Sequence, residues 1–256
     1  MNNTKYGPAE VKKVQNRLLE MAKIIHNILD ENNIPYFITF GTLLGAVRHN
    51  GFIPWDDDLD IFLFDDTYDE AIRVLRNNIP DDMFLEDGES EPLYFHAWAH
   101  IKDNNSKAVC QQYPQDNIYK NHGVSIDLYR AVKMDENDVE MFRALENRKY
   151  IDRKRNVGLM TDNEYAQAVS QNDERIRKAA EKSNAGSGAA VFGMVLKQEK
   201  MYCDDVLPLR KYKFCDTELW GPNNYDSILR HFYNEYMELP SDEEKIPHYE
   251  YVEFYK

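Results

Sequence analysis

Residues 41–61 read GTLLGAVRHNGFIPWDDDLDI, a glycine turn followed by a run of aspartates that leads into apolar residues. The apolar and aromatic segment from Asp58 to Phe64 predicts a β-strand. Residues two apart on a strand share a face, so Asp58 and Asp60 would project together while Leu59 enters the core. Neighbouring carboxylates repel each other unless a cation lies between them, and hard oxygen ligands suit Mg²⁺ or Mn²⁺. The pattern therefore predicts a divalent-metal site at Asp58 and Asp60.

Two other interpretations of the acidic segment stay open. A run of acids can form a solvated turn, although here it continues directly into an apolar strand. Asp56, Asp58 and Asp60 also have the spacing of a calcium loop, but Ile61 stands where such a loop needs glycine. Asp56 and Asp57 fit either outer contacts of the metal site or the turn before the strand, and the turn is favoured for Asp57.

Gly41 and Thr42 lie between a predicted strand, residues 34–40, and a predicted short helix, residues 43–47. A helix that starts after a glycine offers free backbone N–H groups and the positive end of its dipole to an anion. The Thr42 hydroxyl can also donate to a phosphate oxygen, so we expect this turn to bind a substrate phosphate. The alternative is a plain turn with a helix cap. Phosphate and metal would then lie at the same edge of one sheet.

Apolar periodicity and turn residues predict structure over most of the remaining chain. The other predicted helices cover residues 8–31, 67–78 and 225–237, with a charged helical region at residues 136–182. Capping boxes are predicted at Thr67/Glu70 and at Thr161/Glu164. Residues 184–188, which read NAGSG, are expected to form a flexible break.

Two further strands are predicted from alternating apolar residues, at residues 94–102 and 124–129. In the first, His96, Trp98, His100 and Lys102 would share one side. The element order indicates an α+β fold, with a mixed sheet, flanking helices, a helical insertion and a helical C-terminal part. The expected divisions are a catalytic core at residues 1–133, the insertion at residues 134–200, and a segment packing on the core at residues 201–256.

Composition narrows the range of partners and compartments. The chain of 256 residues is 43% hydrophobic, which allows a sizeable core, and its net charge of −14 disfavours a nucleic-acid partner. Three cysteines without zinc-site spacing are typical of a reducing compartment. We find neither a signal-peptide pattern nor an apolar run of about 18 residues, so we expect no transmembrane segment. The expected location is cytoplasmic, with access to a membrane-linked acceptor from the cytosolic side.

Residues 41–61 closely resemble the signature of the LicD family, which includes bacterial cholinephosphotransferases and fukutin-like ribitol-phosphate transferases. Shorter stretches agree: residues 101–103, residues 123–128, and residues 236–240 with His248 downstream. The resemblance implies a nucleotidyltransferase-like core, in which a glycine turn, an Asp-x-Asp strand and a third aspartate on a later strand form the site. It assigns the third aspartate to Asp127.

The resemblance also implies a reaction and its participants. The catalytic residues would be Asp58, Asp60 and Asp127, holding Mg²⁺ or Mn²⁺, with Asp127 either a metal ligand or the base for the acceptor hydroxyl. The donor would be a CDP-activated alcohol phosphate such as CDP-choline. The acceptor would be a glycan or lipid-linked glycan, as in the biosynthesis of lipopolysaccharide or teichoic acid. The identity of the alcohol stays open.

Four further residues are candidates for substrate binding, each with a simpler alternative. Arg48 and Lys102 could contact phosphate or could be surface cations. Trp55 could stack on a base or cover the metal, or could be a structural core residue. His248 could contact substrate, or could be an ordinary surface or partly buried histidine.

Two competing functions are weighed against phosphate transfer. A nucleotide-sugar glycosyltransferase also uses Asp-x-Asp to hold a metal and a diphosphate, but normally places it after a longer nucleotide-binding domain than the first 57 residues can supply. A non-catalytic nucleotide-binding relative would keep the fold without the activity. The presence of Gly41, Thr42, Asp58, Asp60 and Asp127 argues against that second alternative.

Overall fold

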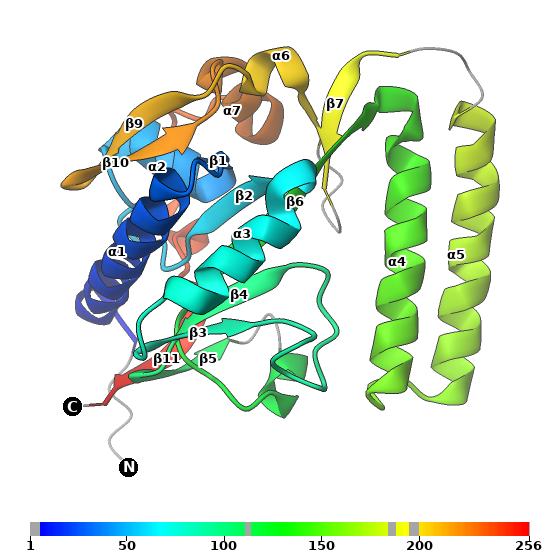
Figure 1. Cartoon of the computed structure of the whole chain (residues 1–256), viewed down its shortest axis with the longest axis horizontal. Helices are drawn as coiled ribbons and strands as arrows, with labels where there is room; N and C mark the ends of the chain where they lie inside the picture. Colours follow the sequence, from blue (N-terminus) through cyan, green and yellow to red (C-terminus); the bar gives the residue numbers. More distant parts are fainter. Residues whose placement is uncertain (1–5, 111–113, 184–187, 195–199, 256) are drawn as a thin grey trace.

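The computed structural model describes residues 6–110, 114–183, 188–194 and 200–255. A mixed sheet with helices packed around it forms the body, and a helical hairpin stands beside it (Figure 1). The helices of the described ranges are α1 (Pro8–Glu31), α2 (Phe40–His49), α3 (Asp65–Asn78), α4 (Val139–Asn156), α5 (Asp162–Ser183), α6 (Cys203–Val206) and α7 (Tyr225–Tyr233). The strands are β1 (Tyr36–Ile38), β2 (Asp60–Phe64), β3 (Met83–Glu86), β4 (Ala99–Asp103), β5 (Ser106–Cys110), β6 (Ser125–Asp135), β7 (Ala190–Gly193), β8 (Lys200–Tyr202), β9 (Arg210–Phe214), β10 (Thr217–Gly221) and β11 (Tyr249–Phe254).

The main sheet has the strand order β1-β2-β6-β4-β3, and β7 and β8 continue it beside the second half of β6. Strands β2 and β6 are parallel, whereas β1 with β2, β6 with β4, and β4 with β3 are antiparallel. A parallel pair cannot be joined by a tight turn, and here α3, β3, β4 and β5 lie between the two strands in the chain. The central position of β6 brings the later acidic strand beside the earlier one.

Apolar side chains from the helices and from the strands themselves stabilise the sheet. Helix α1 packs against α3 and β6, and its residues at helical spacing, such as Leu18 and Ile25, are fully buried. Among the buried aromatic rings, Phe62 of β2 stacks on Tyr129 of β6 with 5.0 Å between ring centroids. Burying each such side chain stabilises the fold by about 1.5–3 kcal/mol, so the core holds the edge carrying the acidic residues in place.

The predicted boundaries are correct for α1 and need correction elsewhere. The strand predicted at residues 34–40 shortens to β1, because Phe40 begins α2 with a positive φ of 49°. Gly41 and Thr42 therefore lie inside the first turn of α2 and not in a break before it. The strand predicted from Asp58 begins at Asp60, so Asp58 precedes the strand.

Three further predictions about local structure were wrong. Helix α3 begins at Asp65, and the Thr67 hydroxyl donates to the Phe64 carbonyl instead of forming a capping box. The strand predicted at residues 94–102 is regular only from Ala99, as β4. Helix α7 ends at Tyr233, four positions before the predicted end.

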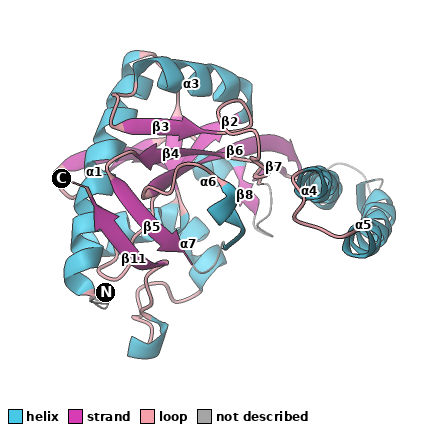
Figure 2. Ribbon diagram, turned by 90° about the horizontal axis from the view of Figure 1, so that it is seen from below, coloured by secondary structure: helices cyan, strands magenta, loops and turns pink. Residues whose placement is uncertain are grey.

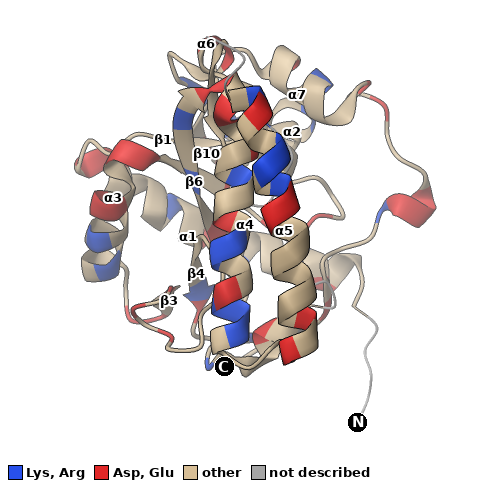
Figure 3. Cartoon of the chain, turned by 90° about the vertical axis from the view of Figure 1, so that its right-hand side faces the viewer, with Lys and Arg blue, Asp and Glu red and all other residues tan. Residues whose placement is uncertain are grey.

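The predicted charged helical region forms the α4–α5 hairpin, whose two helices pack mainly against each other. The capping box at Thr161 is confirmed. The Glu164 amide donates to the Thr161 hydroxyl, and the Thr161 amide donates to the Glu164 carboxylate. Acidic and basic residues are interspersed along α4 and the second half of α5, whereas residues 165–172 of α5 carry no charge (Figure 3). Of the break predicted at residues 184–188, residues 184–187 lie outside the described residues. No helix in the described ranges is long and apolar enough to cross a membrane.

The C-terminal part is not mainly helical, contrary to expectation. It contains α6 and α7 but also the β9–β10 hairpin, and its last strand, β11, pairs with β5. Figure 2 shows the β5–β11 pair below the main sheet. This pairing brings residues just before β11 back to the acidic loop before β2.

Candidate active site

Four titratable side chains form one row across the main sheet. Asp60 of β2 and Asp127 of β6 are register partners, Asp127 lies opposite His100 of β4, and His100 lies opposite Glu86 of β3. Partners directly opposite each other point to the same face of a sheet. The predicted second and third aspartates are therefore neighbours, and the row continues to a buried imidazole and a buried carboxylate.

The Asp127 carboxylate is held by one hydrogen bond and lies beside an imidazole. Its Oδ2 accepts a hydrogen bond of 2.9 Å from the Tyr129 hydroxyl, and its Oδ1 lies 3.4 Å from Nε2 of His100. His100 accepts a 3.0 Å hydrogen bond from the Trp98 indole at Nε2, while its Nδ1 lies 3.4 Å from Oε2 of Glu86. The Tyr129 hydrogen bond therefore orients Asp127 before any substrate binds.

A small polar cavity adjoins this row. Its volume is about 120 Å³, below the roughly 300 Å³ at which drug-sized ligand pockets begin, so it can enclose only part of a substrate. Asp58, Asp127 and His248 contribute to its wall. His96, Trp98, His100 and Lys102 line the same cavity, as expected from the alternation that placed them on one side.

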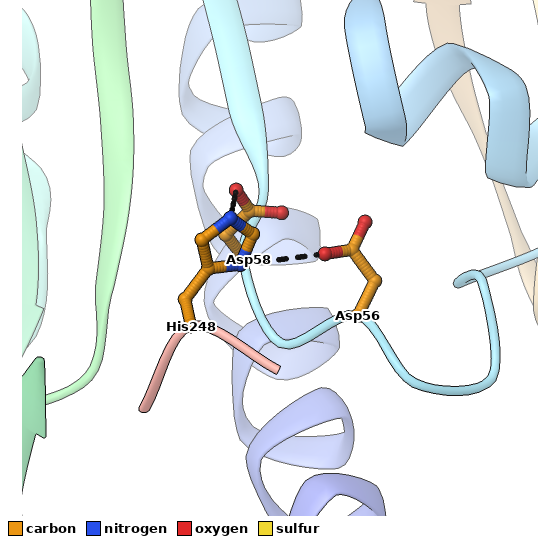
Figure 4. A group of neighbouring side chains, drawn as sticks. All are labelled: Asp56, Asp58 and His248. Atoms are coloured by element: carbon orange, nitrogen blue, oxygen red, sulfur yellow. Dashed lines mark ion pairs between the residues drawn. The ribbon is translucent and has the colours of Figure 1, made fainter. Parts of the chain in front are cut away.

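A second group of ligand-type side chains lies where the chain approaches β2. Asp56, Asp58 and His248 converge there (Figure 4), and one ligand atom from each lies within 4.8 Å of the others. Nε2 of His248 is 3.6 Å from Oδ2 of Asp58, and Nδ1 is 3.5 Å from Oδ1 of Asp56. In the described chain this is the set close enough to share a cation; Asp60 and Asp127 do not belong to it.

The electrostatics of this group favour a positive charge at its centre. Burial raises the pKa of the Asp56 carboxyl well above its usual value, and the charge of Asp58 raises it further. The hydrogen bond to Asp57, together with the charges of Asp58 and Asp56, raises the pKa of His248 to about 10. A second negative charge is thus costly here, while a cation is stabilised.

Asp57 connects the acidic loop before β2 to two other segments of the chain. Its side chain is fully buried, and it accepts hydrogen bonds from the Tyr6 hydroxyl at 2.7 Å, the His248 amide at 2.7 Å and the Tyr249 amide at 3.2 Å. A carboxylate with several donors is a strong local anchor. Asp57 therefore attaches both ends of the chain to the acidic loop and positions His248.

Gly41 and Thr42 contact the acidic residues and not an open phosphate site. The Thr42 hydroxyl is buried and accepts a 2.9 Å hydrogen bond from the Asp60 amide. A Cβ added to Gly41 would lie 2.9 Å from Oδ2 of Asp56, so the glycine allows close approach of that carboxylate. The positive end of the α2 dipole thus faces a carboxylate of the protein itself.

Arg48 and Lys102, the two cationic side chains predicted to contact a substrate phosphate, both contact groups of the protein itself. Arg48 donates from Nη1 to the Tyr236 carbonyl at 2.7 Å, which fastens the segment after α7. Lys102 is buried, and its Nζ lies 2.6 Å from Oε2 of Glu86. Trp55 is partly buried under Lys245, whose Nζ lies 5.3 Å from the ring centroid. Lys102 lines the cavity, whereas Arg48 and Trp55 do not.

Several site residues were missed at the sequence level. One is Tyr233, where partial burial, followed by the negative charges of Asp60, Asp56 and Asp58, raises the pKa of the phenol. The alternation of His100 with Trp98 and Lys102 indicated that these side chains share one side of a strand. No pattern indicated Glu86, because no strand was predicted at residues 83–86. The role of Asp56 was left open between an outer metal contact and a turn.

Converging carboxylates with a nearby imidazole, at one edge of a mixed sheet and beside a polar cavity, are typical of metal-dependent enzymes. A family model described as "LicD/FKTN/FKRP, nucleotidyltransferase domain" matches residues 33–157. The match contains Asp58, Asp60 and Asp127, together with the whole run from α2 to β6. This match, which covers just under half of the chain, agrees with the resemblance of residues 41–61 to the LicD family.

Similar curated proteins include three from distant organisms. An uncharacterized protein of Rickettsia typhi is 34% identical over 151 residues, which are 52% of this chain and 45% of that protein. The lipopolysaccharide cholinephosphotransferase LicD of Haemophilus influenzae is 23% identical over 245 residues, covering 90% of this chain and 92% of the relative. The human ribitol 5-phosphate transferase FKRP is 38% identical over 123 residues, 41% of this chain and 25% of that protein. The chain thus spans less than half of the rickettsial relative.

Proposed function

We propose that the chain is a metal-dependent phosphotransferase. It would move a small alcohol phosphate, such as phosphocholine, from a CDP-activated donor to a hydroxyl of a cell-surface glycan or its lipid-linked precursor. The proposal includes a nucleotidyltransferase-like arrangement of the core, in which α2, the start of β2 and β6 meet at one edge. The relatives named for choline phosphate and ribitol phosphate transfer support the reaction class.

The observation that carries the proposal is the pairing of Asp60 with Asp127 in register, with Asp58 just ahead of β2. Two carboxylates are thus paired across the sheet, and Asp58 and Asp127 both line a cavity that can enclose part of a substrate. Among the described residues, the imidazoles of His248 and His100 lie against Asp58 and Asp127, where structural ion pairing would place a Lys or Arg.

The residues present fit a divalent cation. Asp58 would hold it, with Asp60 and Asp127 as the further oxygen ligands predicted from the sequence, although the ligand atoms that converge within 4.8 Å are those of Asp56, Asp58 and His248. When bound, Mg²⁺ or Mn²⁺ would neutralise the donor diphosphate and the charge that develops during transfer.

In the reaction, an acceptor hydroxyl oxygen forms a bond to the phosphorus that carries the small alcohol. The bond from that phosphorus to the bridging diphosphate oxygen breaks, and CMP leaves with the electron pair. Asp127, which accepts a hydrogen bond from Tyr129, would either complete the metal site or receive the hydroxyl proton. Positioning and charge neutralisation supply most of the rate in such transfers, which is consistent with a preorganised site.

A donor screen tests the proposal. The purified chain is incubated with CDP-choline, CDP-ethanolamine, CDP-glycerol, CDP-ribitol or UDP-glucose, with and without Mg²⁺ or Mn²⁺. We expect one CDP-alcohol to raise the melting temperature only with metal, because a ligand that binds the folded state stabilises it. The same donor should release CMP when a glycan acceptor is added. Stabilisation by UDP-glucose alone would favour a glycosyltransferase, and no response to any donor would favour a non-catalytic relative.

A further inference from the structure

We propose that His248 supplies a nitrogen ligand to a divalent cation bound by Asp56 and Asp58, and that this site prefers Mn²⁺ to Mg²⁺. The inference rests on the proposed metal dependence but assigns different ligands. It shares Asp58 with the set predicted from the sequence and replaces Asp60 and Asp127 by Asp56 and His248.

The first support is the spacing of the ligand atoms. With metal–ligand bonds of about 2.1 Å, adjacent ligands of an octahedral ion lie about 3.0 Å apart and opposite ligands about 4.2 Å apart. The contact of 3.6 Å from His248 Nε2 to Oδ2 of Asp58 falls in this interval, and one ligand atom from each of Asp56, Asp58 and His248 lies within 4.8 Å of the others. The 3.6 Å contact is too long for a good hydrogen bond, which lies near 2.7–3.2 Å. The group is therefore spaced for a bridging ion better than for direct bonding.

The second support is the way in which the imidazole is oriented. Nδ1 of His248 lies 3.3 Å from Oδ1 of Asp57, and the His248 amide donates to the same oxygen. Nε2 is thereby directed to Asp58. A buried carboxylate that orients one ring nitrogen while the other faces a metal is the usual arrangement around histidine ligands. Asp57 provides this arrangement, because three donors outside the imidazole already hold it in place.

The third support concerns charge and ligand type. Asp56 is largely buried beside Asp58, and two close carboxylates favour a divalent ion between them over a single positive charge. Mg²⁺ is bound in proteins almost entirely through oxygen, whereas imidazole nitrogen suits transition metals. Two carboxylates and one imidazole therefore favour Mn²⁺ over Mg²⁺.

The test is electron paramagnetic resonance of the full chain loaded with MnCl₂. Spin-echo modulation detects nitrogen bonded to Mn²⁺, so we expect a ¹⁴N signal in the native chain and its loss in His248→Gln. Mn²⁺ affinity should fall at least about tenfold in that variant, as it does when supporting residues of metal sites are lost. The advantage of Mn²⁺ over Mg²⁺ in competition should fall with it. The matched control is His26→Gln, since His26 bonds to Tyr36 outside this group.

Each other outcome overturns the inference. Bound Mn²⁺ without a ¹⁴N signal would mean that His248 is only a cationic partner of the carboxylates, and the proposed phosphotransferase would stand with oxygen ligands alone. A ¹⁴N signal that persists in His248→Gln would assign the nitrogen to another residue. No binding of Mn²⁺ would remove the site altogether. Transfer activity is measured separately, so failure of the proposed function is recognised by the absence of CMP release from every CDP-alcohol.

Discussion

Asp60 and Asp127 lie directly opposite each other on the parallel strands β2 and β6. Two carboxylates from distant parts of the chain thus share one face at adjacent positions of the sheet. The Asp127 side chain is also held by Tyr129 and faces His100. The pairing is costly without a cation, and it is the geometric basis of the predictions that follow.

Replacing Asp127 by Asn should lower kcat by at least about 100-fold, because a neutral amide neither neutralises the cation nor accepts a proton. The melting temperature without metal should not fall, since repulsion with Asp60 is relieved and the Tyr129 hydroxyl keeps an acceptor. Steady-state kinetics and calorimetry measure the two effects. Asp69→Asn, at an exposed acid paired with Arg130, is the control and should retain activity. Near-native kcat in Asp127→Asn would refute the catalytic assignment.

Replacing Asp57 by Ala should destabilise the fold by about 3 kcal/mol. The hydroxyl of Tyr6 and the amides of His248 and Tyr249 would lose a buried acceptor, and unsatisfied buried donors cost about 1–3 kcal/mol each, partly offset by water. Denaturant unfolding measures the change. Glu250→Ala, at an exposed position on β11, should change stability by less than about 0.5 kcal/mol. Equal effects of the two substitutions would contradict the anchoring role of Asp57.

Without metal, the stabilising effect of His248 should decline at alkaline pH. Its pKa is raised to about 10 in the folded chain, from an ordinary value of 6.5. Such a group contributes its full stabilisation below pH 6.5 and loses it as the pH rises through about 10. The difference in unfolding free energy between the native chain and His248→Gln should therefore shrink from pH 6.5 to pH 10. Unfolding in EDTA over this range tests the sign, and a difference that grows with pH would be inconsistent with it.

Two glycine substitutions should separate site geometry from folding. In Gly41→Ala the new Cβ lies 2.9 Å from Oδ2 of Asp56, so a side chain must shift, whereas in Gly123→Ala it lies 1.8 Å from the backbone oxygen of Asp103. Gly41→Ala should reduce metal affinity and turnover with a small change in melting temperature. Gly123→Ala should destabilise the fold by more than about 3 kcal/mol, because backbone must move. The reverse order of stability would contradict the close contacts described.

Much of the local structure could be predicted because it depends on near neighbours in the chain. The spacing of apolar residues predicted α1 with its correct limits, and the Thr161 capping box was confirmed at the start of α5. The predicted start of α3 was wrong, because the helix begins two residues before Thr67 and includes Asp65 and Asp66. Boundaries of this kind depend on how the ends of an element pack.

The residue types of the candidate site could be predicted from the sequence. The residues that each of them contacts in the fold were harder to predict. The aspartates at residues 58, 60 and 127 follow from the pattern and the family resemblance, and the structure places Asp60 and Asp127 side by side. The burial of Thr42 and the pairing of Lys102 with Glu86 did not follow, because both depend on strands whose register the local sequence does not specify. Their role as direct phosphate contacts remains a prediction.

The sequence by itself determined the acidic chemistry, the strand that carries it and the helices with clear amphipathic periods, because these properties depend on residue type and short-range spacing. Only the tertiary structure decided that β6 lies parallel to β2, that Glu86 and His100 extend the row of Asp127, and that Asp57 brings His248 to Asp56 and Asp58. Those contacts join residues far apart in the chain. Their formation depends on which long-range pairing buries the most apolar surface while satisfying buried polar groups, and a local pattern does not record that balance.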